Sequence, residues 1–287
     1  MLLVQNNQQP KITTASTDDQ ILTLWAAQKS PATQKTYFYV VKQFRSFTDK
    51  PLNQITFDDL LHWMDSLGGQ SQNTKRNKIA VVKSLFGFAH KVGYIPVNPA
   101  QLLKQPKEND CRVERILSKT QVKAIANSAD TFRNEMIAKT LYSLGLRVSE
   151  LIEMQWDDFT QTDNGIKLKV TGKGSKIRFL IVPANLYTDL LQLRKNSDSE
   201  YVFSSRKGNN GGKLSRVQVY RIIKQLGDDQ YIKATPHYLR HSHATHSLDN
   251  GCDLNLLSSS LGHGNIAITS RYLHASETDG SANYIEI

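Results

Sequence analysis

The sequence predicts a mainly α-helical protein of two domains, the second of which also contains a small β-sheet. Apolar residues recur at helical spacing from residue 17 to about residue 103, and again in several runs after residue 116. Two apolar runs, residues 166–171 and 176–182, indicate a β-hairpin. At 287 residues the chain is long enough for each domain to have its own core.

Changes in composition mark the domain boundaries. Residues 1–16 are polar and aperiodic, and we expect them to form a disordered tail. Residues 104–115 lack apolar periodicity and hold a proline and several charges, which is typical of a linker. The first domain is therefore expected to be a helical bundle over residues 17–103, and the second domain to cover residues 116–287.

Capping patterns place the helices of the first domain. Ser30 and Pro31 suit the N-cap and the first position of one helix. Thr56 with Asp59 resembles a capping box for a short helix, and a third helix is expected after Asn73. The apolar residues expected on one face of the first and third of these helices are Tyr37, Val40, Val41, Phe44, Phe47, Ile79, Val82, Leu85, Phe86 and Ala89.

The net charge of +10 favours polyanionic partners, such as nucleic acid or an anionic membrane surface. Residues 1–103 hold eleven Lys and Arg against six Asp and Glu, a surplus of five. Lys75, Arg76 and Lys78 lie near the start of the third helix, where cations oppose the helix dipole, so helix stability does not explain them. They indicate a basic binding face, and the alternative is a charged face that is merely solvated.

Several classes of function are disfavoured. No apolar run approaches the roughly 20 residues needed to span a bilayer, and the first residues lack a signal-peptide pattern, which favours a cytoplasmic protein. Cys111 and Cys252 fit no metal or redox spacing and are interpreted as free thiols in a reducing cytosol. The histidines of residues 237–246 lack metal-ligand spacing, and no nucleotide-binding glycine motif is present. Neither a metal nor a cofactor is therefore expected.

Local patterns also place the elements of the second domain. Ser118 is expected to cap one helix, and a second helix over residues 131–143 is expected to end with Gly145 in a left-handed conformation. Arg147 and Glu150 then stand three residues apart at the start of the next helix, a spacing whose default interpretation is a structural salt bridge.

The candidate reactive groups lie in the second domain. His237, Arg240, His263 and Tyr272 fall within residues 235–274. Imidazole and guanidinium groups can hold non-bridging phosphate oxygens, and a phenol can attack phosphorus. The two β-runs are joined by a glycine-rich turn that places Lys173 at the tip of the hairpin.

Phosphoryl transfer without a metal requires cations around the phosphorus, a nucleophile, and an acid for the leaving oxygen. Arg147 and Arg240 can donate in forked geometry, and Lys173 can serve as the acid. Tyr272 requires such a cationic environment to act as a nucleophile, because the pKa of a free phenol is about 10. Each residue alone is more often structural than catalytic, but together they point to one site.

The order and spacing of these residues resemble the tyrosine recombinase family, the phage-integrase-like site-specific recombinases, and above all its compact Xer-like members. The resemblance covers residues of about 16 to 274. It is carried by GLRVSEL around Arg147, TGKGSK around Lys173, PHYLRHSHATH with His237 and Arg240, LGHGNI with His263, and SRYLH with Tyr272. It implies an N-terminal SAM-like helical core-binding domain and a mostly helical catalytic domain with a small β-sheet.

The resemblance also implies a role for each matching residue. Tyr272 would attack the scissile phosphate and form a 3′-phosphotyrosyl intermediate with a free 5′-hydroxyl. The other roles are a phosphate clamp by Arg147 and Arg240, protonation of the leaving oxygen by Lys173 (with Lys176 as the alternative), proton transfer by His237, a phosphate hydrogen bond from His263, and orientation of the site by Glu150.

By the same resemblance the partner is double-stranded DNA, bound by a homo- or hetero-tetramer on paired recombination sites near the nucleoid. The residues expected to contact DNA from the first domain are Lys75, Arg76, Lys78, Lys35 and Lys42. Two other functions stay open at this point. One is a non-catalytic DNA-binding protein on the same fold, which would have no need of Tyr272. The other is a monomeric type IB topoisomerase, which would relax supercoils without a specific site.

Overall fold

The computed structural model describes residues 12–106, 116–163, 165–195, 199–205 and 212–262, apart from the side chains of Ala32 and Lys173. The chain divides into two compact units, residues 1–110 and 111–287. Helices dominate both units in the described residues, and the second unit adds one three-stranded sheet, so the predicted fold class is confirmed. None of the helices in these ranges combines the length and the apolar character that a bilayer crossing requires.

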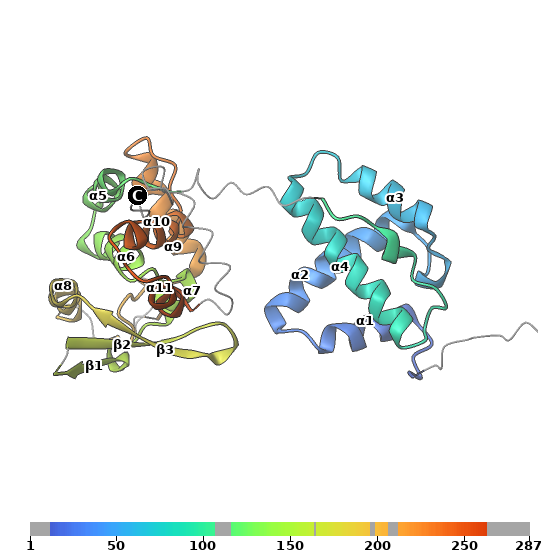
Figure 1. Ribbon diagram of the computed structural model, residues 1–287, viewed down its shortest axis with the longest axis horizontal. Coiled ribbons are helices and arrows are strands. Elements are labelled where there is room, and N and C mark those ends of the chain that lie inside the picture. The colour runs from blue at the N-terminus through green and yellow to red at the C-terminus, as the bar shows by residue number, and fades with distance from the viewer. Residues whose placement is uncertain (1–11, 107–115, 164, 196–198, 206–211, 263–287) are drawn as a thin grey trace, which may run out of the picture. The chain divides into compact units, whose positions relative to one another are not determined.

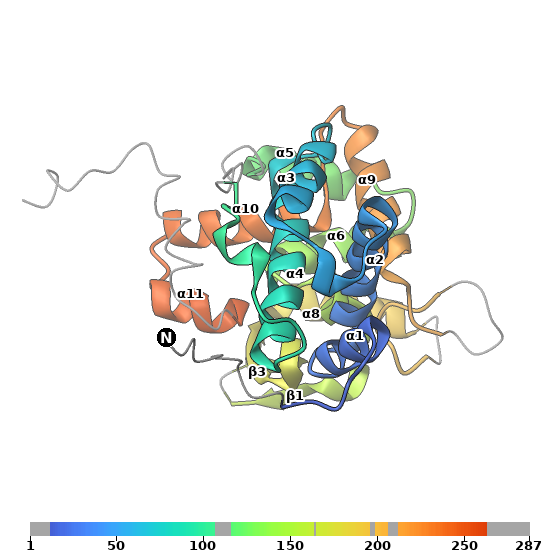
Figure 2. The ribbon, with the colours of Figure 1, turned by 90° about the vertical axis from the view of Figure 1, so that its right-hand side faces the viewer.

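The first unit is a bundle in which α4 (Gln72–Lys91) packs against α1 (Asp18–Ala27) and α2 (Pro31–Thr48) (Figures 1 and 2). Phe44 is fully buried at the centre and meets the rings of Trp63 and Phe86 edge to face, with centroids 5.1 and 5.9 Å away. The other helices described in this unit are α3 (Phe57–Ser66) and short 3-10 helices at Leu52–Gln54 and Pro99–Leu102.

The predicted caps of this unit are confirmed. Pro31 is the first residue of α2 after Ser30, and the Thr56 side chain accepts the backbone N–H of Asp59 while the Asp59 carboxylate accepts that of Thr56. Helix α4 begins at Gln72, slightly earlier than expected. It does so because the side chain of Ser71 accepts the Thr74 N–H and caps the helix there.

Two expectations for this unit need correction. Phe47 lies near the end of α2 and is 47% exposed, so the apolar face of that helix ends before it. The packed chain also begins before residue 17. The backbone N–H of Ile12 donates to the carbonyl of Val92 over 3.0 Å, and Ala15 is buried. Residues 12–16 are therefore held against the bundle.

The second unit places its sheet along one side of a group of helices (Figure 1). The strands are β1 (Phe159–Thr162), β2 (Gly165–Thr171) and β3 (Ile177–Val182), antiparallel in the order β1-β2-β3. The helices are α5 (Lys119–Asn127), α6 (Phe132–Ser143), α7 (Val148–Glu153), α8 (Ala184–Arg194), α9 (Arg216–Asp228), α10 (Pro236–Asp249) and α11 (Leu254–Leu261).

The hairpin of β2 and β3 forms as predicted, but β1 was not foreseen. Its four residues, FTQT, have one large apolar side chain and show no alternation, so the pairing with β2 decides its conformation. Leu168, Val170, Leu180 and Val182 alternate along β2 and β3 and are buried in the main core of this unit. The sheet is thus fixed to the helices through one face.

Helices α10 and α11 lie side by side (Figure 2) and share a small apolar cluster of Ala244, Leu257 and Leu261. This cluster is separate from the main core. Helix α10 begins at Pro236, and the side chain of Thr235 caps it by accepting the backbone N–H of Tyr238. Asp253 caps α11, and Gly262 ends it in the left-handed conformation with φ of 65°.

Candidate active site

The site begins at the joint between α6 and α7. Gly145 follows α6 with φ of 58°, as predicted, and its carbonyl oxygen accepts a hydrogen bond from Nη1 of Arg240. A Cβ at this position would lie 2.5 Å from Cδ2 of His243 and 2.9 Å from Cδ2 of Leu261. Both the backbone conformation and the lack of space therefore require glycine. The segment between α6 and α7 therefore packs closely against α10 and α11 at Gly145, and Arg147 lies two residues further on.

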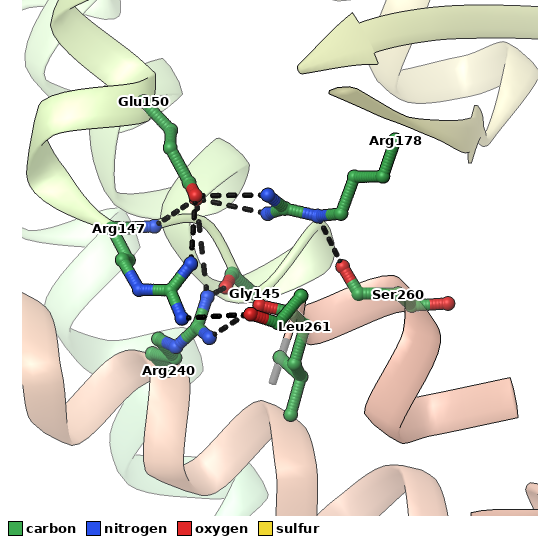
Figure 3. A network of polar contacts seen from close by, with 8 residues as sticks. Gly145, Arg147, Glu150, Arg178, Arg240, Ser260 and Leu261 are labelled. Carbon is green, nitrogen blue, oxygen red and sulfur yellow. Dashed lines mark hydrogen bonds and ion pairs between the residues drawn. The ribbon is translucent and has the colours of Figure 1, made fainter. Parts of the chain in front are cut away.

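Glu150 is the centre of a polar network between α7, α10, α11 and β3 (Figure 3). Its side chain is only 2% exposed. The carboxylate accepts the backbone N–H of Arg147 over 2.8 Å and Nη1 of Arg147 over 2.9 Å. It also accepts both terminal nitrogens of Arg178, each over 2.9 Å. The predicted pair of Arg147 and Glu150 is therefore part of a larger cluster.

Electrostatics keeps this buried carboxylate ionised. Burial alone would raise the pKa of Glu150, but hydrogen bonds from Arg178 and from the backbone and side chain of Arg147 lower it below its ordinary value. Nη1 of Arg240 lies 3.9 Å from the same carboxylate. Three guanidinium groups thus surround one carboxylate, and the cluster carries a formal charge of +2. Such a surplus favours an anion beside it.

Arg147 and Arg240 also hold the end of α11. Arg240 is buried on α10, and its Nη2 donates to the carbonyl of Leu261 over 2.7 Å. Nη2 of Arg147 donates to the carbonyl of Gly262 over 3.2 Å. The carbonyls at a helix C-terminus attract cations, so these contacts satisfy the helix end. The Arg147 side chain is 29% exposed, so solvent reaches the network at this residue.

The structure describes the other predicted site residues to different extents. His237 is exposed on α10, one turn before Arg240, with ring centroids of His241 and Tyr220 at 6.5 and 6.4 Å. The backbone of Lys173 lies in the turn between β2 and β3, where the Gly172 N–H donates to the Lys176 carbonyl over 2.8 Å. His263, Tyr272 and Cys111 lie outside the described residues.

Two histidines of α10 have a structural role. The phenol of Tyr142 lies 2.8 Å from Nδ1 of His246, and burial lowers the pKa of His243 to about 4, helped by the nearby charge of Arg240. His243 is therefore neutral at pH 7. Among the described residues, no three His, Cys, Asp or Glu side chains gather closely enough to hold a metal ion.

The residue that the sequence prediction missed is Arg178. Its side chain is 11% exposed, and Nε donates to the Ser260 carbonyl over 2.6 Å while the terminal nitrogens bind Glu150. One signal was available. In the run IRFLIV, Arg178 shares its strand face with Leu180 and Val182, so strand alternation turns this charge toward the core. A buried charge requires a partner, and Glu150 supplies it.

The five basic residues expected to contact DNA lie on α2 and α4 of the first unit. Nζ of Lys78 donates to Oε1 of Gln43 over 2.7 Å, so this lysine also links α4 to α2. Lys42 lines a surface pocket of about 450 Å³ between α1 and α2. Lys35 is exposed, whereas Lys75 and Arg76 are half-buried.

Comparison with known proteins gives the family. The model of the phage integrase family matches residues 115–279. Tyrosine recombinase XerA of Pyrococcus furiosus is 31% identical over 267 residues, which are 90% of each chain. Tyrosine recombinase XerD of Staphylococcus aureus is 32% identical over 261 residues, covering 83% of this chain and 86% of the relative. The chain belongs to the phage integrase family. As a tyrosine recombinase, it is an enzyme of DNA strand cleavage and rejoining.

Solved structures agree with this assignment. The crystal structure of XerA recombinase is 28% identical, with a TM-score of 0.51 over 91% of this chain and 95% of that one. A lambda integrase dimer bound to a COC′ core site has a TM-score of 0.77 over 95% of this chain and 81% of that one. At 18% identity, that second likeness concerns the fold alone. Both the mainly helical fold and the tyrosine recombinase family predicted from the sequence are confirmed.

Proposed function

We propose that this tyrosine recombinase cleaves double-stranded DNA at a specific site through Tyr272 and rejoins it without a metal ion or ATP. The observation that carries the assignment of the site is the Glu150 network, which holds Arg147 and Arg240 together with a surplus of positive charge. A buried cluster of this charge suits the non-bridging oxygens of one phosphodiester.

The chemical step follows from the groups at the site. The phenolic oxygen of Tyr272 forms a bond to phosphorus, and the bond from phosphorus to the 5′-oxygen breaks. The tyrosine proton passes to His237 or to solvent, and Lys173 supplies a proton to the leaving 5′-oxygen. Lys176, exposed immediately before β3, is the alternative acid. His263 donates to the phosphate.

The arginines stabilise the charge that develops on the phosphoryl oxygens. Arg147 stands at the open side of the network, where a backbone phosphate can approach it. Arg240 is buried behind it and is oriented by the carbonyls of Gly145 and Leu261. Donors fixed in this way need little reorganisation when the transition state forms, and that is the main source of their catalytic effect.

The phosphotyrosyl intermediate preserves the energy of the broken phosphodiester. Attack by a free 5′-hydroxyl on that intermediate restores a phosphodiester and releases Tyr272, so rejoining requires no external energy source. Exchange of strands between two DNA sites requires four such cleavages, and we infer a homo- or hetero-tetramer on paired sites. The basic residues of α2 and α4 would hold DNA mainly through its phosphates.

A covalent-adduct assay tests this function. DNA fragments selected by binding are nicked near the cleavage point, so that a short product diffuses away and the adduct accumulates. The protein is incubated with this DNA in EDTA, denatured with detergent and separated by electrophoresis. The expected result is a slow-migrating adduct that Tyr272→Phe abolishes. No adduct from the wild-type protein, or one that persists in Tyr272→Phe, would overturn the proposal. Relaxation of arbitrary supercoiled plasmids would instead indicate a topoisomerase.

A further inference from the structure

Arg178 lies in a position that the catalytic roles above do not explain. It occupies β3, pairs in register with Val170 of β2, and points to the same face as the buried Leu180 and Val182. Its guanidinium uses Nη1 and Nη2 for the carboxylate of Glu150 and Nε for the carbonyl of Ser260 (Figure 3). One side chain therefore binds α7 and α11 from the sheet.

The contacts of Arg178 reach the residues next to two proposed site groups. Gly172 directly precedes Lys173, and a Cβ on Gly172 would lie 3.3 Å from Nη1 of Arg178 and 3.5 Å from Oε1 of Glu150. Gly262 directly precedes His263, and a Cβ on Gly262 would lie 3.1 Å from Nη1 of Arg178. Both glycines thus pack closely against the same guanidinium.

Apolar packing alone does not join these elements. The inner face of the sheet belongs to the main core, whereas the buried apolar residues of α11, Leu257 and Leu261, belong to the separate cluster with Ala244. The hydrogen bond from Arg178 to Ser260 therefore links β3, which packs on the main core, to α11, which packs in the separate cluster. Hydrogen bonds from an ionised donor are short and strong, so this bond fixes the distance and orientation of Ser260 relative to β3.

We propose that Arg178 is a positioning residue for cleavage, which holds the hairpin carrying Lys173 at a fixed place beside Glu150 and the end of α11. It acts through the hairpin and does not itself touch the scissile phosphate. The inference rests on the proposed function, because it assumes that Lys173 is the acid for the leaving oxygen. A displacement of about 1 Å in such a group can cost roughly 100-fold in rate.

Two variants separate charge from geometry. Arg178→Met keeps an unbranched apolar stem but removes every hydrogen bond. Arg178→Lys keeps the positive charge beside Glu150, but a single ammonium cannot reproduce the fork that binds Glu150 and Ser260 together. Arg194→Met is the matched control. It removes an exposed arginine of the same unit that stacks 5.5 Å from the ring centroid of Trp156.

The experiment measures single-turnover cleavage of nicked DNA, with the thermal midpoint of unfolding and the Kd for DNA measured beside it. We expect Arg178→Lys to unfold near the wild-type temperature and to bind DNA within threefold of wild type, yet to cleave about 100-fold more slowly. Arg194→Met should cleave at the wild-type rate. If Arg178→Lys folds and cleaves as the wild-type protein does, Arg178 acts through its charge alone and the proposal is wrong.

A second substrate tests whether Arg178 acts through the lysine hairpin. Replacing the bridging 5′-oxygen by sulfur gives a leaving thiolate that needs no acid, because a thiol is far more acidic than an alcohol. The cleavage defect of Arg178→Lys and Arg178→Met should then shrink by at least about tenfold relative to wild type. An equal defect on both substrates overturns the proposal.

Controls keep this outcome distinct from failure of the proposed function. Lys173→Ala should show the same recovery on the sulfur substrate. If Lys173→Ala cleaves both substrates with an equal defect while the wild-type protein forms the adduct, the acid role of Lys173 is refuted. If Lys173→Ala recovers and the Arg178 variants do not, only the positioning role of Arg178 is refuted.

Discussion

Nη2 of Arg240 donates to the carbonyl oxygen of Leu261, so a proposed phosphate-binding arginine of α10 also fixes the last residue of α11. Its Nη1 donates to the carbonyl of Gly145 and so holds the start of the joint before Arg147. A side chain that orients neighbouring site elements couples stability to catalysis.

Glu150→Gln should destabilise the protein by about 3 kcal/mol, because the guanidinium groups around this position would lose the negative charge that balances them. Denaturant unfolding measures the change. Glu153→Gln is the control, since it makes the same substitution on the same helix. The Glu153 side chain is 55% exposed and pairs with Lys213, so this change should cost less than about 1 kcal/mol. Equal costs at the two positions would show that the network is not stabilising.

The free energy of unfolding should decrease as the pH is lowered, because of His243. Burial lowers the pKa of His243 in the folded protein to about 4, against 6.5 in its ordinary state. The unfolded chain therefore takes up a proton first as pH falls through 6.5, and unfolding becomes easier. Between pH 7 and pH 5 this residue should reduce the free energy of unfolding by about 2 kcal/mol. His243→Asn should lose that part of the pH dependence, and an unchanged slope in the variant would refute the assignment.

Gly145→Ala should cost several kcal/mol of stability, because the new methyl group would need a left-handed backbone and would collide with His243. Gly251→Ala is a suitable comparison. Gly251 has φ of 85° but nothing within 4 Å of an added Cβ, so its substitution should cost only about 1 kcal/mol for the backbone conformation. Thermal or denaturant unfolding checks both, and similar losses would mean that the close contact does not matter.

Lys75→Gln should weaken DNA binding at low salt and reduce the slope of log K against log salt by about 1, because one phosphate contact is lost. Lys50 of the same unit is paired with Asp59 over 2.7 Å and is not among the predicted DNA contacts, so Lys50→Gln should leave the slope unchanged. Binding titrations at several salt concentrations measure both. An unchanged slope in Lys75→Gln would remove this residue from the interface.

Much of the fold followed from local sequence because local interactions decide it. The boxes at Thr56 and Ser118, the left-handed Gly145 and the pair of Arg147 and Glu150 each involve residues at most three apart or one backbone conformation. Strand β1 was not predicted because its pairing with β2, and not its own composition, makes it extended.

The site was only partly predictable for the same reason. Arg178 meets Glu150 across 28 positions and Ser260 across 82, and no local spacing encodes such contacts. Arg240 likewise bonds to Gly145 across 95 positions. The motif residues could be named from their order, but the carboxylate that gathers three arginines emerges only when the chain folds.

The proposed nucleophile is tested by identifying the residue that carries the DNA. The adduct formed on nicked DNA is digested with nuclease and protease, and the nucleotide-bearing peptide is sequenced by mass spectrometry. We expect a nucleotide joined through its 3′-phosphate to the phenolic oxygen of Tyr272. A nucleotide on Tyr238, on Tyr284 or on any other side chain would contradict it.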